Sequence, residues 1–220
     1  MSLKPKIIVM LGQTSTGKSD FAVNIAKKIK GEIISADSRQ VYKGMDLGTG
    51  KITKKEMQGI PHYLLDVVSP KKIFSVSDYK KLADKKISEI LARGKTPIIC
   101  GGTGFYIDAV VDGVTLPEVP PNLKLRETLG KKSAEDLLKI LIKLDSVRAE
   151  NIDVKNKVRL IRAIEIAKVL GKVPKIKQNT QYEVLKIGLT IPDEILKERI
   201  HTRLLARIKK GMLKEIGSLH

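Results

Sequence analysis

The stretch that most constrains the fold is residues 7–19, where an apolar run leads directly into a glycine-rich loop. Residues 7–11 are apolar throughout and predict a short buried strand. The loop that follows fits G-x-x-x-x-G-K-[ST], and its fixed positions are Gly12, Gly17, Lys18 and Ser19. Residues 20–29 then predict a helix, whose expected core-facing side chains are Phe21, Ile25 and Ile29. Because the N–H groups of such a loop converge on an anion, the chain is predicted to bind a phosphorylated ligand.

A chain of 220 residues with 42% hydrophobic residues is long enough for one large domain, or for one domain with a smaller insertion. Its apolar runs are too short to span a membrane, and the N-terminal sequence lacks a signal-peptide pattern. Cys100, the single cysteine, falls within an apolar run and is predicted to be a buried free thiol. One cysteine permits no internal disulfide, which fits a reducing compartment, so a cytoplasmic location is expected.

The charge of the chain is strongly positive. Lys and Arg number 42 against 24 Asp and Glu, which leaves a formal charge of +18 and a pI near 9.9. An enzyme acting on small metabolites has no need of such a field, whereas a polyanion is attracted by it. The alternative is a lysine-rich protein whose charges are simply solvated. We favour a nucleic-acid partner.

Strand-like segments alternate with helical ones along the chain, which predicts a parallel sheet flanked by helices. The expected strands are residues 7–11, 31–36, 63–68, 97–100 and 184–191. From Leu116 onward three prolines in five residues mark a boundary, and residues 122–172 have helical patterns only. We therefore predict an α/β fold, a P-loop NTPase-like parallel sheet with an inserted all-helical domain. Residues 1–115 and 184–220 would form the α/β core, and residues 116–183 the insertion.

Polar residues follow two of the predicted strands at the edge where a parallel sheet binds its ligand. Asp37 comes directly after residues 31–36 and is a candidate site carboxylate, although an Asp-Ser pair also serves as a turn or helix cap. Residues 97–100 lead into Gly101–Gly104, where many phosphate-loop ATPases have an acid that supports magnesium and water. Because that position holds glycines here, Asp66 is the remaining candidate for such an acid. The glycine ending favours a transferase over an enzyme that activates water.

Arginines are regularly spaced on two predicted helices. Arg159 and Arg162 lie three residues apart on one face, which is either a solvated basic surface or a grip on nucleic-acid phosphates. The side chains expected to face the core of that helix are Val158, Ile161, Ile164, Ile166 and Leu170. On the final helix the arginines recur at every fourth position, at Arg199, Arg203 and Arg207. The strand before this helix would bring its N-terminal half near the ligand crevice.

Several of these stretches together resemble the tRNA dimethylallyltransferase (tRNA isopentenyltransferase) family. The most specific are Asp-Ser-Arg-Gln-Val-Tyr-Lys-Gly-Met-Asp at residues 37–46 and Gly-Gly-Thr-Gly-Phe-Tyr at residues 101–106. The other matching stretches are residues 12–19, 47–49, 61–66, 159–165 and 199–203. The resemblance covers nearly the whole chain. The chain differs from the family at Gln13, where the family usually has Pro, and at Arg207, where the family commonly has Met.

The resemblance implies transfer of a dimethylallyl group from dimethylallyl pyrophosphate to N6 of the adenine 3′ to the tRNA anticodon, with release of pyrophosphate. Asp37 would accept the N6 proton, while Lys18, Arg203 and a Mg²⁺ ion on Ser19 would offset charge on the leaving group. The implied catalytic residues are Asp37, Arg203, Lys18 and Thr14. The implied pyrophosphate-binding residues are Gly12, Gln13, Thr14, Ser15, Thr16, Gly17, Lys18 and Ser19. The implied tRNA contacts are Asp37, Ser38, Arg39, Gln40, Thr103, Arg126, Val158, Arg159, Leu160, Ile161 and Arg162.

The expected partners are the tRNA anticodon stem-loop and dimethylallyl pyrophosphate, the expected cofactor is Mg²⁺, and the protein is expected to be a monomer that does not bind a membrane. Family members continue past the position of His220 through a segment with further tRNA contacts, so we expect this chain to be a shortened form or to lack residues that follow. Three alternatives stay open: a phosphate-loop kinase of a small molecule or nucleotide, an adenylate isopentenyltransferase, and an RNA-binding module with a vestigial phosphate loop.

Overall fold

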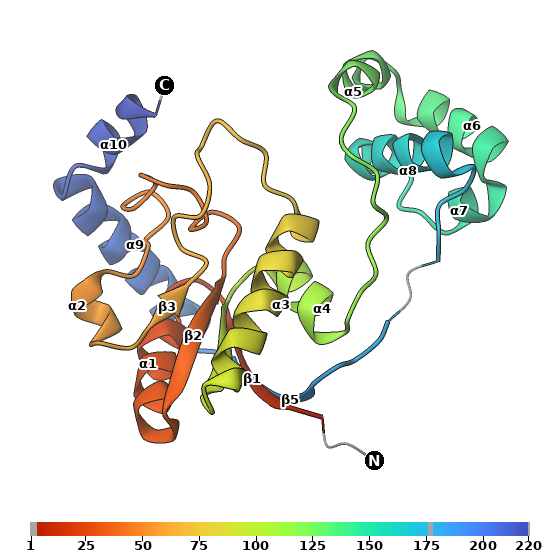
Figure 1. The fold of residues 1–220 in the computed structure, drawn as a ribbon. Coiled ribbons are helices and arrows are strands. Elements are labelled where there is room, and N and C mark those ends of the chain that lie inside the picture. Colours follow the sequence, from red (N-terminus) through yellow and green to blue (C-terminus); the bar gives the residue numbers. More distant parts are fainter. Residues whose placement is uncertain (1–3, 176–177, 220) are drawn as a thin grey trace. The chain divides into compact units, whose positions relative to one another are not determined.

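The structure is a computed structural model that describes residues 4–175 and 178–219, and it divides into two compact units (Figure 1). The first, which we call the sheet unit, takes the chain as far as Val114 and resumes at Gln178. The residues between them form the second, which we call the helical unit. The predicted insertion ended later, at residue 183, because residues 178–182 had no pattern that assigned them to either part.

The described residues of the sheet unit form a five-stranded sheet in which every pair of neighbours is parallel. The strands are β1 (Lys6–Gly12), β2 (Gly31–Ala36), β3 (His62–Tyr63), β4 (Thr96–Gly101) and β5 (Glu183–Leu189), in the order β3-β2-β4-β1-β5. The register sets Leu11 beside Gly101 and Gly101 beside Ala36. The carboxyl ends of β1, β4 and β2 therefore lie level, and the predicted P-loop-like α/β fold is confirmed.

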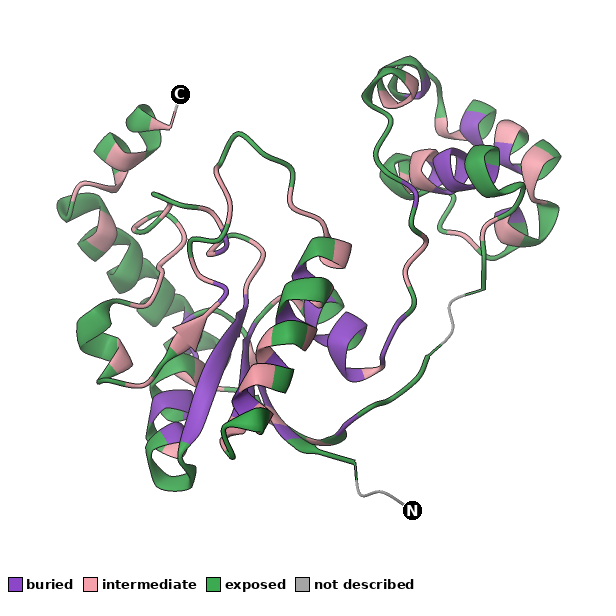
Figure 2. Ribbon diagram, viewed as in Figure 1, coloured by how far each residue is buried: buried purple, intermediate pink, exposed green. Residues whose placement is uncertain are grey.

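Alternate residues of the central strands face opposite helical layers, as the period of two along a strand requires. On one face, α1 (Lys18–Ile29) packs over Met10 and Ile98. On the other face, α3 (Val76–Ala92) and α4 (Gly104–Val111) pack over Val9 and Ile99. Figure 2 shows the buried residues concentrated on these strands and on the sides of the helices that face them.

Of the side chains expected to face the sheet from α1, Ile25 packs against the core, but Phe21 and Ile29 do not lie where they were expected. Ala22, Val23 and Ala26 are completely buried, whereas Phe21 is 39% and Ile29 37% exposed. Two alanines one turn apart leave no bulk between the helix backbone and the strands. The small residues thus set the close contact, and the larger ones are displaced to its rim.

The strand predicted at 63–68 is the least accurate of the strand assignments. β3 ends at Tyr63, because Leu64 and Asp66 adopt left-handed backbone conformations with φ of +62° and +56°. Val68 returns to form an isolated parallel bridge with Tyr42. The short helices α2 (Lys54–Met57), α7 (Ser146–Glu150) and α10 (Met212–Ser218), and α4 as well, were not predicted. Three of them are under eight residues long and give little periodic signal.

The helical unit packs its helices around a core of its own. Its elements are α5 (Leu123–Gly130), α6 (Ala134–Leu144), α7 and α8 (Lys157–Leu170). Leu137, Leu141, Leu160 and Ile164 are completely buried at the centre of this core. Val158, expected to face the core, is 77% exposed, because the buried face of α8 is centred on Leu160 instead.

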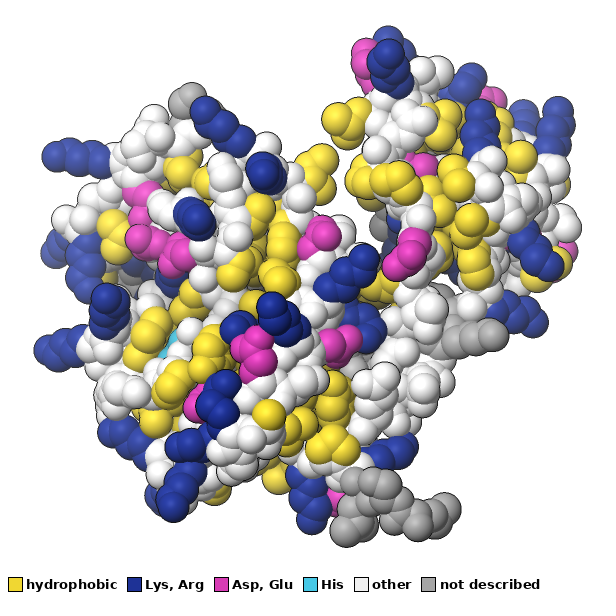
Figure 3. Space-filling model, viewed as in Figure 1, with side chains coloured by type: hydrophobic (Ala, Val, Ile, Leu, Met, Phe, Trp, Pro, Cys, Tyr) yellow, Lys and Arg dark blue, Asp and Glu magenta, His cyan; other side chains and the backbone are white. Residues whose placement is uncertain are grey.

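The sheet unit ends with α9 (Asp193–Lys209) and α10, and α9 buries Leu196 while most of its remaining surface is exposed. Figure 3 shows Lys and Arg side chains on the visible face of each unit, and exposed apolar side chains among these charged ones. Among the residues that the structure describes, none of the helices combines the length and the apolar character that crossing a membrane requires.

Candidate active site

The shape of the phosphate loop between β1 and α1 is fixed by its backbone conformation and by contacts with its own residues and with β5. Three of its residues have positive φ: Gly12 (155°), Ser15 (70°) and Gly17 (90°). A Cβ on Gly12 would lie 2.6 Å from the carbonyl oxygen of Leu189 in β5, so a larger residue would push β1 and β5 apart. Thr16 donates from Oγ1 to the Gln13 carbonyl at 2.9 Å. The loop is therefore held in shape by contacts internal to the protein.

Two cations meet at this loop. Lys18 Nζ donates to the Gln13 carbonyl at 3.2 Å, and Arg203 of α9 donates to Ser15 Oγ at 3.2 Å. Burial lowers the pKa of the Lys18 ammonium, the charge of Arg203 lowers it further, and the charge of Asp37 opposes both. Arg203, one of the three arginines spaced along α9, thus lies at the phosphate loop.

Asp37 begins a tight turn immediately after β2. Its Oδ1 accepts hydrogen bonds from the backbone N–H groups of Arg39 at 2.8 Å and Gln40 at 3.3 Å. Ser38 donates its N–H to Thr103 Oγ1 at 3.0 Å, which ties the turn to the segment after β4. Neighbouring strands lie about 4.8 Å apart, so the two-strand separation between β2 and β1 places Asp37 roughly 10 Å from Gly12. The turn-forming and site roles of Asp37, posed as alternatives from the sequence, are compatible.

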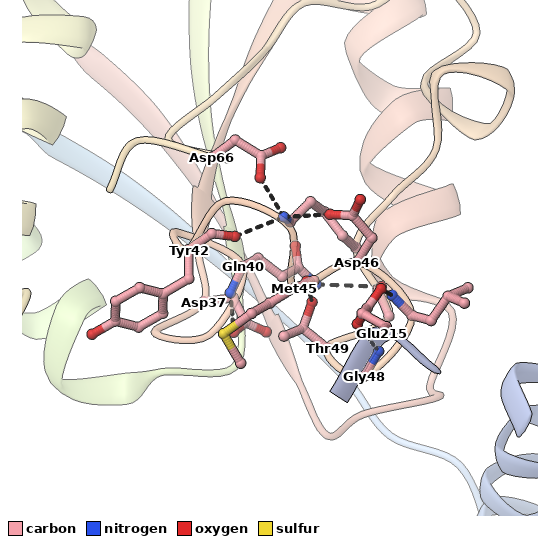
Figure 4. A network of polar contacts seen from close by, with 12 residues as sticks. Asp37, Gln40, Tyr42, Met45, Asp46, Gly48, Thr49, Asp66 and Glu215 are labelled. Atoms are coloured by element: carbon pink, nitrogen blue, oxygen red, sulfur yellow. Dashed lines mark hydrogen bonds and ion pairs between the residues drawn. The ribbon is translucent and has the colours of Figure 1, made fainter. Parts of the chain in front are cut away.

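Residues 42–51 form a loop beside this turn that is organised by Lys51 (Figure 4). The Lys51 ammonium donates to the Tyr42 carbonyl at 2.9 Å, to Asp46 Oδ1 at 2.7 Å and to Asp66 Oδ1 at 2.5 Å. Only 6% of the Lys51 side chain is exposed. Asp66 therefore acts as an ion-pair partner of Lys51 in this structure.

No group of three or more His, Cys, Asp or Glu able to hold a metal occurs among the described residues. A magnesium ion that is bound through phosphate oxygens and water needs few protein ligands, and a hydroxyl at the start of α1 is a suitable one. Ser19 is exposed and lines a small cavity with Ser35, Gln40 and Cys100. The Ser19 hydroxyl suits an ion that arrives with a phosphorylated substrate. The residues around it do not suit a structural metal.

Two of the candidates in the helical unit, Arg126 and Arg162, contact a buried carboxylate. Glu165 is 1% exposed and accepts hydrogen bonds from Arg126 Nε at 3.0 Å, Arg126 Nη2 at 2.7 Å and the Asn122 N–H at 2.6 Å. Arg162 also pairs with Glu165 and donates to the Val119 carbonyl at 2.9 Å. Burial raises the pKa of Glu165, but these hydrogen bonds and the charge of Arg126 outweigh it and hold the pKa at about 2.

Arg159 and Arg162, predicted to share one basic face, have different surroundings, and Arg126 is held in the same way as Arg162. Arg126 and Arg162 are held on Glu165, and about a third of each side chain is exposed. Arg159 is 65% exposed and pairs with Asp153 at 3.6 Å. Leu160 is completely buried, so its side chain is unavailable for a contact with tRNA, while Val158 is exposed. Ile161 packs against the core of the unit.

The remaining candidates lie in the sheet unit near the phosphate loop. Gln13, Thr14 and Arg39 are exposed, and Ser38, Gln40 and Thr103 are half-buried. Sequence reasoning did not single out Lys51 or Glu215, whose contacts order residues 42–51. Neither residue has a local pattern that separates it from a solvated charge. The family-like sequence at residues 37–46 was the available signal that residues 42–51 contribute to the site.

A comparison with protein families matches residues 40–220 to the IPP transferase family. A tRNA dimethylallyltransferase from Leuconostoc mesenteroides is 43% identical over 217 residues, which are 97% of this chain and 72% of that protein.

Two solved structures resemble this one. A tRNA isopentenylpyrophosphate transferase from Bacillus halodurans has a TM-score of 0.70 at 38% identity, over 98% of this chain and 70% of that one. A eukaryotic dimethylallyltransferase acting on tRNA has a TM-score of 0.86 at 28% identity, over 98% of this chain and 56% of that one.

Proposed function

The chain belongs to the IPP transferase family, and we therefore propose that it is a tRNA dimethylallyltransferase. It transfers a dimethylallyl group from dimethylallyl pyrophosphate to N6 of the adenine on the 3′ side of the anticodon, and it releases pyrophosphate. The bond between C1 of the donor and its pyrophosphate oxygen breaks, a bond between C1 and N6 forms, and one N6 proton leaves.

The observation that carries this proposal is the pairing of an anion cradle with a separate carboxylate. Lys18 and Arg203 both lie at the phosphate loop, where their charges would stabilise the pyrophosphate as it leaves. Asp37 follows β2, which is two strands from β1 in the sheet, and its charge raises the pKa of Lys18. A site that displaces pyrophosphate needs an anion-binding loop and a proton acceptor, and it needs no acid to activate water.

Asp37 is proposed to accept the proton from N6. The N6 lone pair is delocalised into the purine ring, so removing the proton as the new bond forms makes this nitrogen a better nucleophile. The hydrogen bonds from Arg39 and Gln40 to Oδ1 fix the orientation of the carboxylate. Because the target adenine is stacked in the anticodon arm, it has to swing out before Asp37 can reach it.

We propose that Mg²⁺ binds with the donor, with the Ser19 hydroxyl as a protein ligand. When bound, such an ion would neutralise part of the pyrophosphate charge. Thr14 and the loop N–H groups would hold the remaining phosphate oxygens, since Thr14 is exposed at the turn of the loop.

The net charge of +18 supports binding of the tRNA backbone. In the helical unit Arg159 is the candidate whose side chain is most open to a phosphate. Arg126 and Arg162 would contribute only through the exposed third of each side chain, because Glu165 holds the rest. We propose that the enzyme is a cytoplasmic monomer.

The direct test incubates the protein with labelled dimethylallyl pyrophosphate, Mg²⁺ and an unmodified anticodon stem-loop, and measures label in the RNA. Asp37→Asn is expected to lower kcat by about 10²- to 10⁴-fold, with stem-loop affinity kept within a factor of two or three. Asp108→Asn, on the exposed side of α4, is the matched control. A kcat for Asp37→Asn within tenfold of wild type would refute the assignment of the base.

The same assay separates the alternatives. Label in AMP in place of RNA would indicate an adenylate isopentenyltransferase, and ATP-dependent phosphorylation without tRNA would indicate a kinase. Stem-loop binding that is indifferent to the donor, with no labelled product, would indicate an RNA-binding module.

A further inference from the structure

We propose that Glu215 of α10 is a positioning residue, which holds the turn at residues 47–50 and through it the orientation of Asp37. The inference deepens the proposed function and rests on it, because Asp37 is there the proton acceptor. Glu215 itself touches neither of the proposed substrates.

The first step from Glu215 toward Asp37 is the binding of the Glu215 carboxylate to two successive backbone amides (Figure 4). Glu215 Oε2 accepts from the Leu47 N–H at 2.7 Å, and Oε1 accepts from the Gly48 N–H at 2.9 Å. A Cβ on Gly48 would lie 3.4 Å from Oε1, which confirms that the carboxylate packs directly against this turn. Hydrogen bonds to a charged acceptor are about twice as strong as neutral ones, so this pair fixes the turn firmly.

The second step is the turn itself, which is closed on itself and held from two further sides. The Gly50 N–H donates to the Leu47 carbonyl at 3.1 Å, and the Lys51 N–H to the Asp46 carbonyl at 2.9 Å. The buried Lys51 ammonium joins the same loop to Asp66, as described above. On the other side, a Cβ on Gly50 would lie 1.7 Å from Nη2 of Arg207, so the guanidinium of α9 occupies the space that a side chain would need.

The third step leads from the turn to the proposed base. Gln40 Nε2 donates to the Gly50 carbonyl at 3.4 Å, while the backbone N–H of Gln40 donates to Asp37 Oδ1 at 3.3 Å. Gln40 thus joins the turn to the carboxylate. A shift of the turn moves Gln40, and a shift of Gln40 alters one of the two hydrogen bonds that orient Asp37.

The setting of Glu215 argues against a role limited to stability. α10, all of whose residues are described, buries none of its own side chains, and the hydrophobic clusters of the sheet unit lie elsewhere. Loss of the carboxylate therefore leaves the core intact and removes two of the hydrogen bonds that hold the turn. A displacement of about 1 Å at a reacting group can reduce turnover by about 10²-fold, so the main effect is expected in kcat.

The test compares Glu215→Gln with Glu198→Gln, the same change at an exposed position of α9. The amide at 215 keeps one acceptor and turns an NH₂ toward a donor, so one of the two contacts is lost. We expect kcat for dimethylallyl transfer to fall about 10- to 100-fold in Glu215→Gln, with the KM for the donor within twofold and Tm within about 2 °C of wild type. Glu198→Gln should match wild type throughout. A Tm that falls together with kcat, or a kcat within threefold of wild type, would overturn the proposal.

A double variant tests the connection through Gln40. If both residues act through the same turn, Glu215→Gln should change kcat less than twofold in a Gln40→Ala background, although it changes kcat at least tenfold alone. Multiplicative losses would show that the two residues act independently and would overturn the proposal.

Amide hydrogen exchange supplies a readout that needs no activity. Glu215→Gln should accelerate exchange at least tenfold in peptides covering residues 37–42 and 45–51, and leave peptides from β1 and β4 unchanged. Acceleration confined to 45–51 would overturn the proposal. If the wild-type protein transfers no label, the proposed function fails, and the exchange result still decides whether Glu215 orders the Asp37 turn.

Discussion

The buried carboxylate of Glu165 gives a stability prediction whose size follows from the structure. Two arginines and a backbone amide hold this carboxylate in its charged form and lower its pKa from 4.5 to about 2. At about 1.4 kcal/mol per pKa unit, the ionised carboxylate contributes about 3 kcal/mol to folding. Replacing Glu165 by Gln, which has nearly the same shape, should remove about that amount at pH 7.

The pH dependence has a definite sign. A folded-state pKa below the unfolded value gives stability that is fully present above pH 4.5 and lost as the pH falls toward 2. By pH 3 the two pKa values predict a loss of about 2 kcal/mol of the contribution. The difference between wild type and Glu165→Gln should therefore shrink from about 3 kcal/mol at pH 7 to about 1 kcal/mol at pH 3.

Urea unfolding followed by circular dichroism at both pH values measures this difference. Glu127→Gln is the matched control, since Glu127 is on α5 and its pair with Lys131 is 3.8 Å long and at least three-quarters exposed. That variant should stay within about 0.5 kcal/mol of wild type. A Glu165→Gln difference below about 1 kcal/mol at pH 7, or one that does not change with pH, would refute the reasoning.

Three further experiments, the first with a matched control variant, test separate parts of the structure. Gly101→Ala should cost about 3 kcal/mol or more in urea unfolding, because its Cβ would lie 2.1 Å from the Ala36 carbonyl oxygen. Gly104→Ala, with no atom within 4 Å of the added Cβ, should be nearly neutral. The Cys100 thiol, whose pKa burial raises to about 11, should resist iodoacetamide at pH 8 until the protein unfolds, and rapid alkylation of folded protein would contradict its burial. Arg159→Ala should weaken stem-loop binding and reduce the slope of log K against log [salt] by about one, and an unchanged slope would remove Arg159 from the interface.

Local patterns in the sequence predicted the parts of the protein that local chemistry determines. The phosphate loop is defined by the spacing of its glycines, lysine and serine, and most strands and longer helices by the period of their apolar residues. Strand ends were less predictable. At residues 64–66 two residues in left-handed conformations end β3, and the sequence there has no glycine that would have predicted them. The exposure of Val158 shows the same limit, since several faces of α8 carry apolar residues and the neighbouring helices decide which one is buried.

The sequence by itself determined a glycine-rich loop on a parallel sheet and a helical insertion, and it predicted that the loop binds an anion with a carboxylate nearby. Tertiary structure alone decided which charged side chains are partners. Glu215 binds amides 168 and 167 residues away, and Arg126 reaches Glu165 across 39 residues. A single lysine, arginine or glutamate has the same local signature whether it is solvated or paired. Only the fold brings its partner close enough, and excludes enough water, for the charge to acquire a role.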